Sequence, residues 1–311
     1  MKFSVIIPTY NRCETLAKTL SSIESQNFSK DDFEVIIVDD SSGDSTRLVA
    51  EEFSRKNKIN IRYFFQEHLG HGRAKNTGIE NARGEILLFC GDDTIFDKHL
   101  LEKHNEAYQK YKEDRFALLG LSAWDESIGV SDFMRYLAPN GPQFHFGTIK
   151  NFKDAGWHHF YTCNISVPKV LVGDLRFDER FVFGFEDIDF GLRLTKKNVK
   201  IYFDPAAIVY HSHPHEPANF YKRMFLVGNA FILFTRLNKK NRKDYWEIKF
   251  RYAPFDLFPG QVRLFNFLTK KLSSWKFLER RNKKLHWFFN VCYHYSSGII
   301  KERKKYESTG Q

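Results

Sequence analysis

The sequence Ile86-Leu87-Leu88-Phe89-Cys90-Gly91-Asp92-Asp93-Thr94 contains five consecutive apolar residues, which end at a glycine and two carboxylates. A short apolar run bounded by a turn residue is typical of a strand that is covered on both faces, as in a parallel sheet. Ligands of open α/β sheets bind just beyond the carboxyl ends of the strands. The stretch therefore predicts a buried strand with Asp92 and Asp93 at the functional edge of the sheet.

Asp92 and Asp93 place two like charges side by side, and a divalent cation is the simplest compensation for them. Oxygen ligands suit Mg²⁺ or Mn²⁺. The alternative is a loop in which an Asp caps the following helix, expected near Lys98, because Asp is common at helix N-termini. The residues alone leave both interpretations open.

A second apolar run, at residues 35–38, also ends in an acidic pair, Asp39-Asp40. Two acidic strand ends in one sheet can face one ligand, with one pair accepting hydrogen bonds from a base and sugar hydroxyls and the other holding a metal. Strands alternate with segments of helical spacing, which predicts a doubly wound, mostly parallel sheet. The strands expected in this alternation are 4–7, 35–38, 61–65, 86–90 and 117–121.

Charge divides the chain into two parts. Residues 215–311 contain 21 Lys and Arg against 7 Asp and Glu, a net charge of +14, whereas residues 1–214 carry −4. This asymmetry predicts a catalytic domain over 1–214 and a basic, aromatic-rich helical extension over 215–311.

Several classes of protein are not expected from this sequence. The four cysteines are far apart and form no CxxC pair, so neither structural zinc nor a disulfide framework is expected. Pro8 ends the first apolar run before it reaches the length of a signal peptide, and no run reaches the roughly 18 residues of a membrane span. Lys75 stands where a dinucleotide-binding fingerprint needs glycine, and no P-loop string is present.

Five segments, taken in order, resemble family 2 glycosyltransferases of the GT-A fold. Residues 4–12 with 34–42 resemble the opening of that family, and 72–78 its Arg-Asn-x-Gly helix start, although here Lys75 precedes Asn76 and the Arg is displaced to Arg73. Asp92-Asp93 is similar to a short form of the Asp-x-Asp metal motif. Residues 185–194 resemble the Glu-Asp motif, and 207–211 the segment that ends in a metal-side His. The resemblance covers about residues 1–213.

The resemblance implies an inverting, metal-dependent transfer of a sugar from a nucleotide-diphosphate donor, expected to be a UDP-sugar, to a hydroxyl acceptor. It implies that Asp93 and His211 bind Mn²⁺ or Mg²⁺ and that Asp187, beside Glu186, is the general base. Trp157 would contact the acceptor. The implied nucleotide and donor contacts are Pro8, Thr9, Tyr10, Asn11, Asp39, Asp40, Arg73, Asp92 and Asn164, with Asp39 or Asp40 accepting from the ring N–H of the base.

Physical chemistry agrees with these roles. A divalent ion stabilises the charge that grows on a departing diphosphate, and a carboxylate that takes the acceptor proton typically accelerates such a step by about 10²–10⁴. Alternatives remain open for individual residues. Glu186 and Asp187 could simply be acids at a helix N-terminus, His211 could be a surface histidine, and Trp157 could belong to the core.

The basic extension predicts an anionic membrane surface as a partner. It could instead pack on the catalytic domain through its Phe residues, and nucleic acid is the less favoured partner. The expected acceptor is a glycan, glycolipid or protein-linked sugar in envelope glycan synthesis, and the expected location is the cytoplasm, peripheral to the cytoplasmic face of the membrane. The enzyme alternative is a sugar nucleotidyltransferase, and the non-enzyme alternative is a glycan- or membrane-binding descendant without activity.

Overall fold

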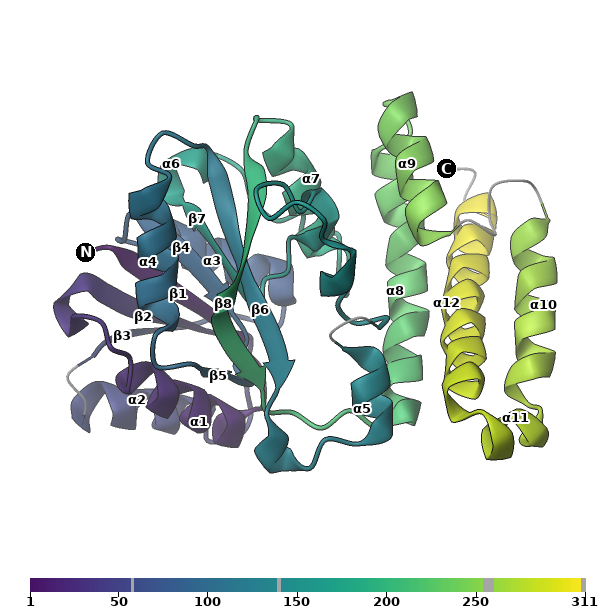
Figure 1. The fold of residues 1–311 in the computed structure, drawn as a ribbon, viewed down its shortest axis with the longest axis horizontal. Helices are drawn as coiled ribbons and strands as arrows, with labels where there is room; N and C mark the ends of the chain where they lie inside the picture. Colours follow the sequence, from purple (N-terminus) through teal and green to yellow (C-terminus); the bar gives the residue numbers. More distant parts are fainter. Residues whose placement is uncertain (57–58, 139–140, 254–259, 309–311) are drawn as a thin grey trace. The chain divides into compact units, whose positions relative to one another are not determined.

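The structure, a computed structural model, describes residues 1–56, 59–138, 141–253 and 260–308 (Figure 1). The chain forms two compact units. The first comprises Met1–Val182 and Glu186–Pro214, and the second comprises Phe183–Phe185 and His215–Gln311. The change of unit at residue 215 coincides with the change in charge, and the segment Phe183–Phe185 joins the basic unit.

A mixed sheet organises the first unit, with the strand order β3-β2-β1-β4-β7-β6-β8-β5 in the described residues. Strands β1 to β4 run parallel to one another, and β7 is antiparallel to both β4 and β6. The expected mostly parallel α/β sheet is confirmed, and within it β7 and β5 are antiparallel to their neighbours. The strands are β1 (Phe3–Thr9), β2 (Phe33–Asp39), β3 (Asn60–Phe65), β4 (Ile86–Cys90), β5 (Thr94–Phe96), β6 (Phe116–Trp124), β7 (Asn164–Pro168) and β8 (Lys200–His211).

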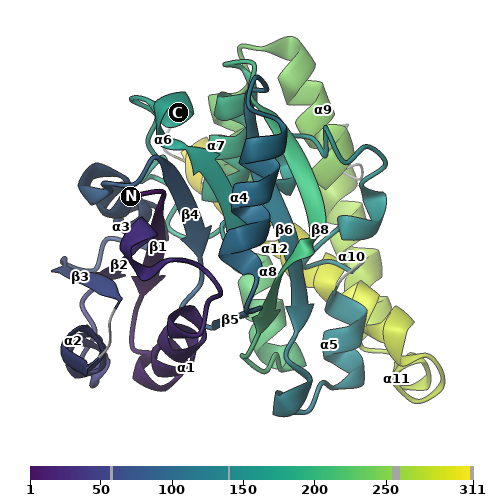
Figure 2. The ribbon, with the colours of Figure 1, turned by 60° about the vertical axis from the view of Figure 1, so that its left-hand side comes forward.

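Helices cover both faces of this sheet, which explains why its central strands are apolar without alternation (Figures 1 and 2). Val5 of β1 shares a core cluster with Leu16 of α1, whereas the next residue, Ile6, lies against Gly78 of α3 on the other face. The helices of this unit are α1 (Cys13–Glu24), α2 (Thr46–Lys56), α3 (His71–Asn81), α4 (Leu100–Lys110), α5 (Asp132–Leu137), α6 (Lys169–Val172) and α7 (Glu186–Thr195).

The strand β8 continues through Asp204-Pro205. It is one strand whose register against β6 shifts between Gly120 and Leu121. Irregularities of this kind absorb extra residues without ending a strand. A Cβ at position 120 would lie 2.2 Å from Asn164 Nδ2 and 2.3 Å from the Ala207 oxygen, so the irregular region requires glycine there.

The second unit is helical in the residues described. Helices α8 and α12 pack closely, since a Cβ at Gly228 would lie 2.1 Å from the Tyr295 oxygen and one at Gly298 would lie 2.0 Å from the Phe225 oxygen. Within this unit α12 lies between α8 and α10 (Figure 1). Across the described residues, none of the helices combines the length and the apolarity that crossing a bilayer demands. The helices are α8 (Pro217–Leu237), α9 (Arg242–Tyr252), α10 (Gln261–Ser273), α11 (Lys276–Arg281) and α12 (Lys283–Ser308).

The contact between α3 and β1 gives a test of how α3 is positioned. A Cβ at Gly78 would lie 2.3 Å from Cγ2 of Ile6, which is fully buried and has no room to move. We expect Gly78→Ala to lower the free energy of unfolding by about 1–3 kcal/mol, measured by urea denaturation. Gly72 begins the same helix, and its Cβ would meet neighbours at an ordinary 3.6 Å. An equal loss in Gly72→Ala would contradict the steric explanation.

Candidate functional site

An arginine compensates the acidic pair at the end of β4. Arg12 Nη1, from the loop after β1, lies 2.6 Å from Asp93 Oδ2 and 3.3 Å from Asp92 Oδ1. Thr9 Oγ1 donates to Asp92 Oδ2 at 2.7 Å. No role for Arg12 was expected from the sequence, although the acid pair requires a counter-charge and Arg12 stands in the first segment of the family resemblance.

Strand pairing places His211 next to this acidic pair. Strand β5 begins directly after Asp93 and pairs antiparallel with β8, which sets Thr94 opposite His211. His211 Nδ1 lies 3.5 Å from Asp93 Oδ1. The imidazole is buried, and its Nε2 has no hydrogen-bond partner in the described part of the chain. The structure therefore brings together Asp92, Asp93 and His211, as expected, and His211 is not a surface histidine.

The charges in this cluster shift each other's protonation. Burial and the neighbouring Asp93 carboxylate raise the pKa of Asp92 to about 7. Burial opposes ionisation of Asp93 too, but His211 and Arg12 lower its pKa below the ordinary value. Although burial by itself would lower it, the contact with Asp93 raises the pKa of His211 to about 10. Without further ligands, Asp93 is thus ionised between two cationic partners.

The donor set fits a divalent cation that shares its ligands with a substrate. Asp93 supplies carboxylate oxygens and His211 an imidazole nitrogen without a partner, and both are ligands of Mn²⁺. Over the ranges that the structure describes, no group of three or more His, Cys, Asp or Glu side chains is arranged to hold a metal. Mg²⁺ commonly binds through one or two carboxylates, water and substrate phosphates, and two protein ligands suit that mode.

The carboxylates of Asp39 and Asp40, at the end of β2, accept hydrogen bonds from other groups of the protein. Asp39 accepts from Tyr63 Oη at 2.6 Å and from the Ser42 amide at 2.7 Å. Asp40 accepts from the amides of Leu69 and Gly70, each at 2.9 Å. These carboxylates order the loops that surround the end of β2.

The loop after β1 is fastened to the loop after β2. Asn11 has a φ of 52°. Its side-chain oxygen accepts from the Gly43 backbone amide at 2.7 Å, and its backbone amide donates to Ser42 Oγ at 2.8 Å. Next to it, the ring of Tyr10 is 41% exposed and lies 4.4 Å from the His68 ring, centroid to centroid. Pro8, two residues before Tyr10, is half-buried at the end of β1. Tyr10 thus presents an accessible aromatic face beside the acidic strand ends.

A buried lysine, Lys75, pairs with the two predicted catalytic acids, Glu186 and Asp187. Lys75 Nζ contacts Asp187 Oδ1 and lies 3.2 Å from Glu186 Oε1. The other Asp187 oxygen accepts from the amide of Thr162 at 3.0 Å and from its hydroxyl at 2.7 Å. The pKa of Lys75 is raised because the two carboxylates outweigh the effect of its burial. The acids at the start of α7 are therefore more than helix caps.

Strand pairing brings the two clusters to the same edge of the sheet. Cys90 of β4 lies opposite Asn164 of the antiparallel strand β7. Asp92 follows Cys90 by two residues, and Thr162, which donates to Asp187, precedes Asn164 by two residues. The acidic pair after β4 and the Asp187 cluster therefore lie at one edge of the sheet.

Two predicted donor contacts are not brought to this site. Arg73 pairs with the exposed Glu179 at 3.0 Å. Residues two apart on a helix point about 200° away from each other, so Lys75 is the cation of α3 that faces the acids, and a donor contact by Arg73 stays a prediction. Asn164 is fully buried, and its amide bonds to His104, Leu121 and Ala207. With these partners the amide holds β6, β7 and β8 together, and a donor-sugar contact by Asn164 stays a prediction.

Trp157 lies in a short 3₁₀ turn, Trp157–His159, that packs on α7. A Cβ at Gly191 of α7 would lie 2.6 Å from the Trp157 oxygen, so the backbones approach closely. The indole is half-buried. Its place beside α7 is compatible with the proposed acceptor contact and leaves that role a proposal.

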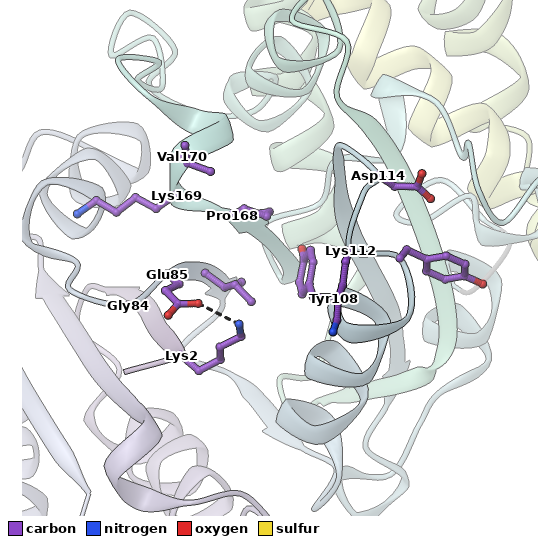
Figure 3. Close-up of a pocket in the computed structure, with 11 residues that line it drawn as sticks. Lys2, Gly84, Glu85, Tyr108, Lys112, Asp114, Pro168, Lys169 and Val170 are labelled. Atoms are coloured by element: carbon purple, nitrogen blue, oxygen red, sulfur yellow. Dashed lines mark hydrogen bonds and ion pairs between the residues drawn. The ribbon is translucent and has the colours of Figure 1, made fainter.

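A pocket at the opposite edge of the sheet is distinct from this site (Figure 3). It lies by the start of β4 and the end of β7, whereas Asp92 and Asp93 follow the end of β4. Figure 3 shows the Lys2–Glu85 ion pair at this pocket, 2.9 Å between charged atoms. Because α/β enzymes bind ligands at the carboxyl ends of strands, the acidic cluster remains the candidate site.

Comparison with known proteins places the chain among glycosyltransferases. Residues 4–163 match the family described as Glycosyl transferase family 2. A Methanococcus voltae dolichyl N-acetyl-α-D-glucosaminyl phosphate 3-β-D-2,3-diacetamido-2,3-dideoxy-β-D-glucuronosyltransferase is 26% identical over 75% of this chain and 74% of its own length. A Campylobacter jejuni GalNAc(5)-diNAcBac-PP-undecaprenol β-1,3-glucosyltransferase is 37% identical over 34% of this chain and 36% of its own.

Solved structures share the fold. Staphylococcus aureus TarS 1-349 in complex with UDP has a TM-score of 0.58 at 20% identity, covering 100% of this chain and 92% of that chain. The mannosyltransferase PcManGT from Pyrobaculum calidifontis, in complex with GDP-Man and Mn²⁺, has a TM-score of 0.70 at 15% identity, covering 98% and 87%. The predicted GT-A fold is thereby confirmed.

The ion pairs of Lys75 give a test of the charge balance in the site. Lys75→Met leaves Glu186 and Asp187 without their common cation, and we expect a loss of about 2–4 kcal/mol in unfolding free energy. Adding Asp187→Asn to that variant should recover part of the loss, as urea denaturation would show. Lys103→Met, which breaks an exposed pair with Glu106, should cost under about 1 kcal/mol. Strict additivity of the Lys75 and Asp187 changes would refute the coupling.

Proposed function

Because this chain belongs to glycosyltransferase family 2, we propose that it transfers a sugar from a UDP-sugar to a hydroxyl acceptor with inversion at the anomeric carbon. One observation carries the proposal: the Asp92–Asp93–His211 cluster and the Lys75–Asp187 cluster lie at the same edge of the sheet, where β4 pairs with β7. One cluster suits a diphosphate with its cation, and the other suits an alcohol that must lose a proton.

The nucleotide would bind at the loops after β1 and β2. Tyr10 offers an exposed ring for the base, and Asp39 and Asp40 lie buried beneath these loops. A uracil base is favoured because its ring N–H can donate to one of these carboxylates. The TarS structures that share this fold were solved with UDP and with UDP-GlcNAc.

A Mn²⁺ or Mg²⁺ ion held by Asp93 and His211, with Asp92 alongside, would act as a Lewis acid on the departing diphosphate. The chain's own contribution is to keep these ligands in place. Arg12 holds both carboxylates from one side, and Thr9 fixes Asp92. The site is therefore preorganised for a cation that the donor brings with it.

Asp187 is the proposed general base. Two donors from Thr162 fix one of its oxygens, and Lys75 contacts the other. A carboxylate fixed in this way can take the proton of the acceptor hydroxyl in the transition state. Attack by that hydroxyl on the anomeric carbon, opposite the diphosphate, inverts the configuration at this carbon. Lys75 compensates the negative charge of Asp187 and of the neighbouring Glu186.

The acceptor is proposed to be an envelope glycan, glycolipid or protein-linked sugar. Two relatives are named for transfers to a dolichyl phosphate-linked sugar and to a diphosphate-undecaprenol-linked glycan. An acceptor of this kind would be met at a membrane, and we propose that the enzyme works as a peripheral protein on its anionic cytoplasmic surface. Trp157 is the proposed acceptor contact.

Donor turnover tests the metal and the base. UDP release from a panel of UDP-sugars should require Mn²⁺ or Mg²⁺ and stop in chelator. Asp93→Asn should abolish the metal response, and Asp187→Asn should slow transfer by about 10²–10⁴ while Mn²⁺-dependent UDP binding persists. Arg47→Gln, which breaks an exposed pair with Glu51 on α2, is the control and should remain near wild type. Full turnover of the Asp93 and Asp187 variants in chelator would overturn the proposal.

The stereochemistry of transfer is a separate test. With an α-linked UDP-sugar, the first product observed by proton NMR of the anomeric region should be the β-glycoside, because a single displacement inverts the centre. A first product with retained α configuration would rule out the single displacement assigned to Asp187.

A further inference from the structure

The helical unit carries a group of large apolar side chains that are exposed. They lie on α10, α11, the turn between these helices and the first part of α12, and we call them the α10–α11 face. Its members are Leu264, Phe267, Leu268, Trp275, Phe277, Leu285 and Phe288, which are 38–60% exposed. Contiguous exposed apolar side chains on a protein surface mark an interaction site.

Helix α10 is apolar on two sides. Its inner side contacts α12, where Asn266 Nδ2 donates to Ser296 Oγ at 3.0 Å and to Ser297 Oγ at 2.7 Å. Leu264, Phe267 and Leu268 follow the helical spacing of a second side and are exposed. Packing within the unit therefore explains the inner side of α10 and leaves the outer side for a partner.

Basic residues are interspersed with these apolar ones along the sequence. Between residues 261 and 288 the sequence has eight Lys and Arg and one acid, Glu279. Lys271 Nζ lies 4.7 Å from the centroid of the Phe267 ring. Two copies of such a face would bring like charges together, so charge complementarity favours an anionic partner over a second copy of this chain. The basic residues are Arg263, Lys270, Lys271, Lys276, Arg280, Arg281, Lys283 and Lys284.

We propose that the α10–α11 face docks on an anionic lipid bilayer. Trp275, Phe277 and the exposed leucines would enter the boundary between headgroups and acyl chains, with lysines and arginines at the anionic headgroups. Nucleic acid would use basic and aromatic residues, but Leu264, Leu268 and Leu285 have no ring on which a base could stack. The proposal rests on the membrane partner proposed above and assigns that partner to named residues.

Vesicle flotation of the full chain tests the face. Wild type should float with phosphatidylglycerol–phosphatidylcholine vesicles, and salt should weaken binding. Lys270→Gln with Lys271→Gln should weaken it about 25-fold, since each charge near an anionic surface is worth about fivefold. Phe267→Ser with Trp275→Ser should weaken it at least about tenfold. The control is Leu48→Ser with Arg55→Gln, exposed residues of α2 in the catalytic unit, and it should bind like wild type.

Several results would overturn the proposal. They are equal binding to pure phosphatidylcholine vesicles, wild-type binding by both face variants, and binding of a single-stranded oligonucleotide in place of vesicles. Loss of concentration-dependent self-association in the face variants, without vesicle binding by wild type, would assign the face to a second copy instead. UDP release and thermal unfolding are measured on the same samples. UDP release should be unchanged in the face variants, so failure of vesicle binding is distinguishable from failure of the transferase assignment.

Discussion

The compensation of two adjacent carboxylates is the constraint on which the site depends. Asp92 and Asp93 stand side by side at the end of a fully buried strand, where charges without partners would destabilise the fold. Arg12, in the loop after β1, forms ion pairs with both carboxylates, and His211, at the end of β8, lies beside Asp93. The charge requirement of two residues thus connects three separate parts of the first unit.

The two acidic strand ends use their oxygens differently. Asp39 and Asp40 receive hydrogen bonds from the protein's own hydroxyl and amide groups, which order the neighbouring loops. Asp93 instead lies beside a buried imidazole that retains a nitrogen without a partner. The first pair therefore orders the loops around the end of β2, and the second pair lies beside a nitrogen that is available to a ligand.

Much of this arrangement could be predicted from the sequence, because it depends on short apolar runs and on what directly follows them. The runs ending at Asp39 and Asp92 gave the parallel core, and the family resemblance linked Asp93 with His211. Arg12 and Lys75 were missed in these roles because a long, flexible side chain gives no periodic signal of which acid it meets. The enclosure of the Asn164 amide was missed because it depends on the pairing of β6, β7 and β8.

The glycines at the crossing of α8 and α12 limit how the helical unit can evolve. Gly228 and Gly298 bring the two backbones so close that any larger residue would force them apart. Substitution is therefore restricted unequally within this unit. The two glycine positions where α8 meets α12 accept no side chain, whereas solvent-facing positions can change without disturbing this contact. Homologous proteins could therefore change the binding properties of the outer helix surfaces while keeping the same packing of α8 on α12.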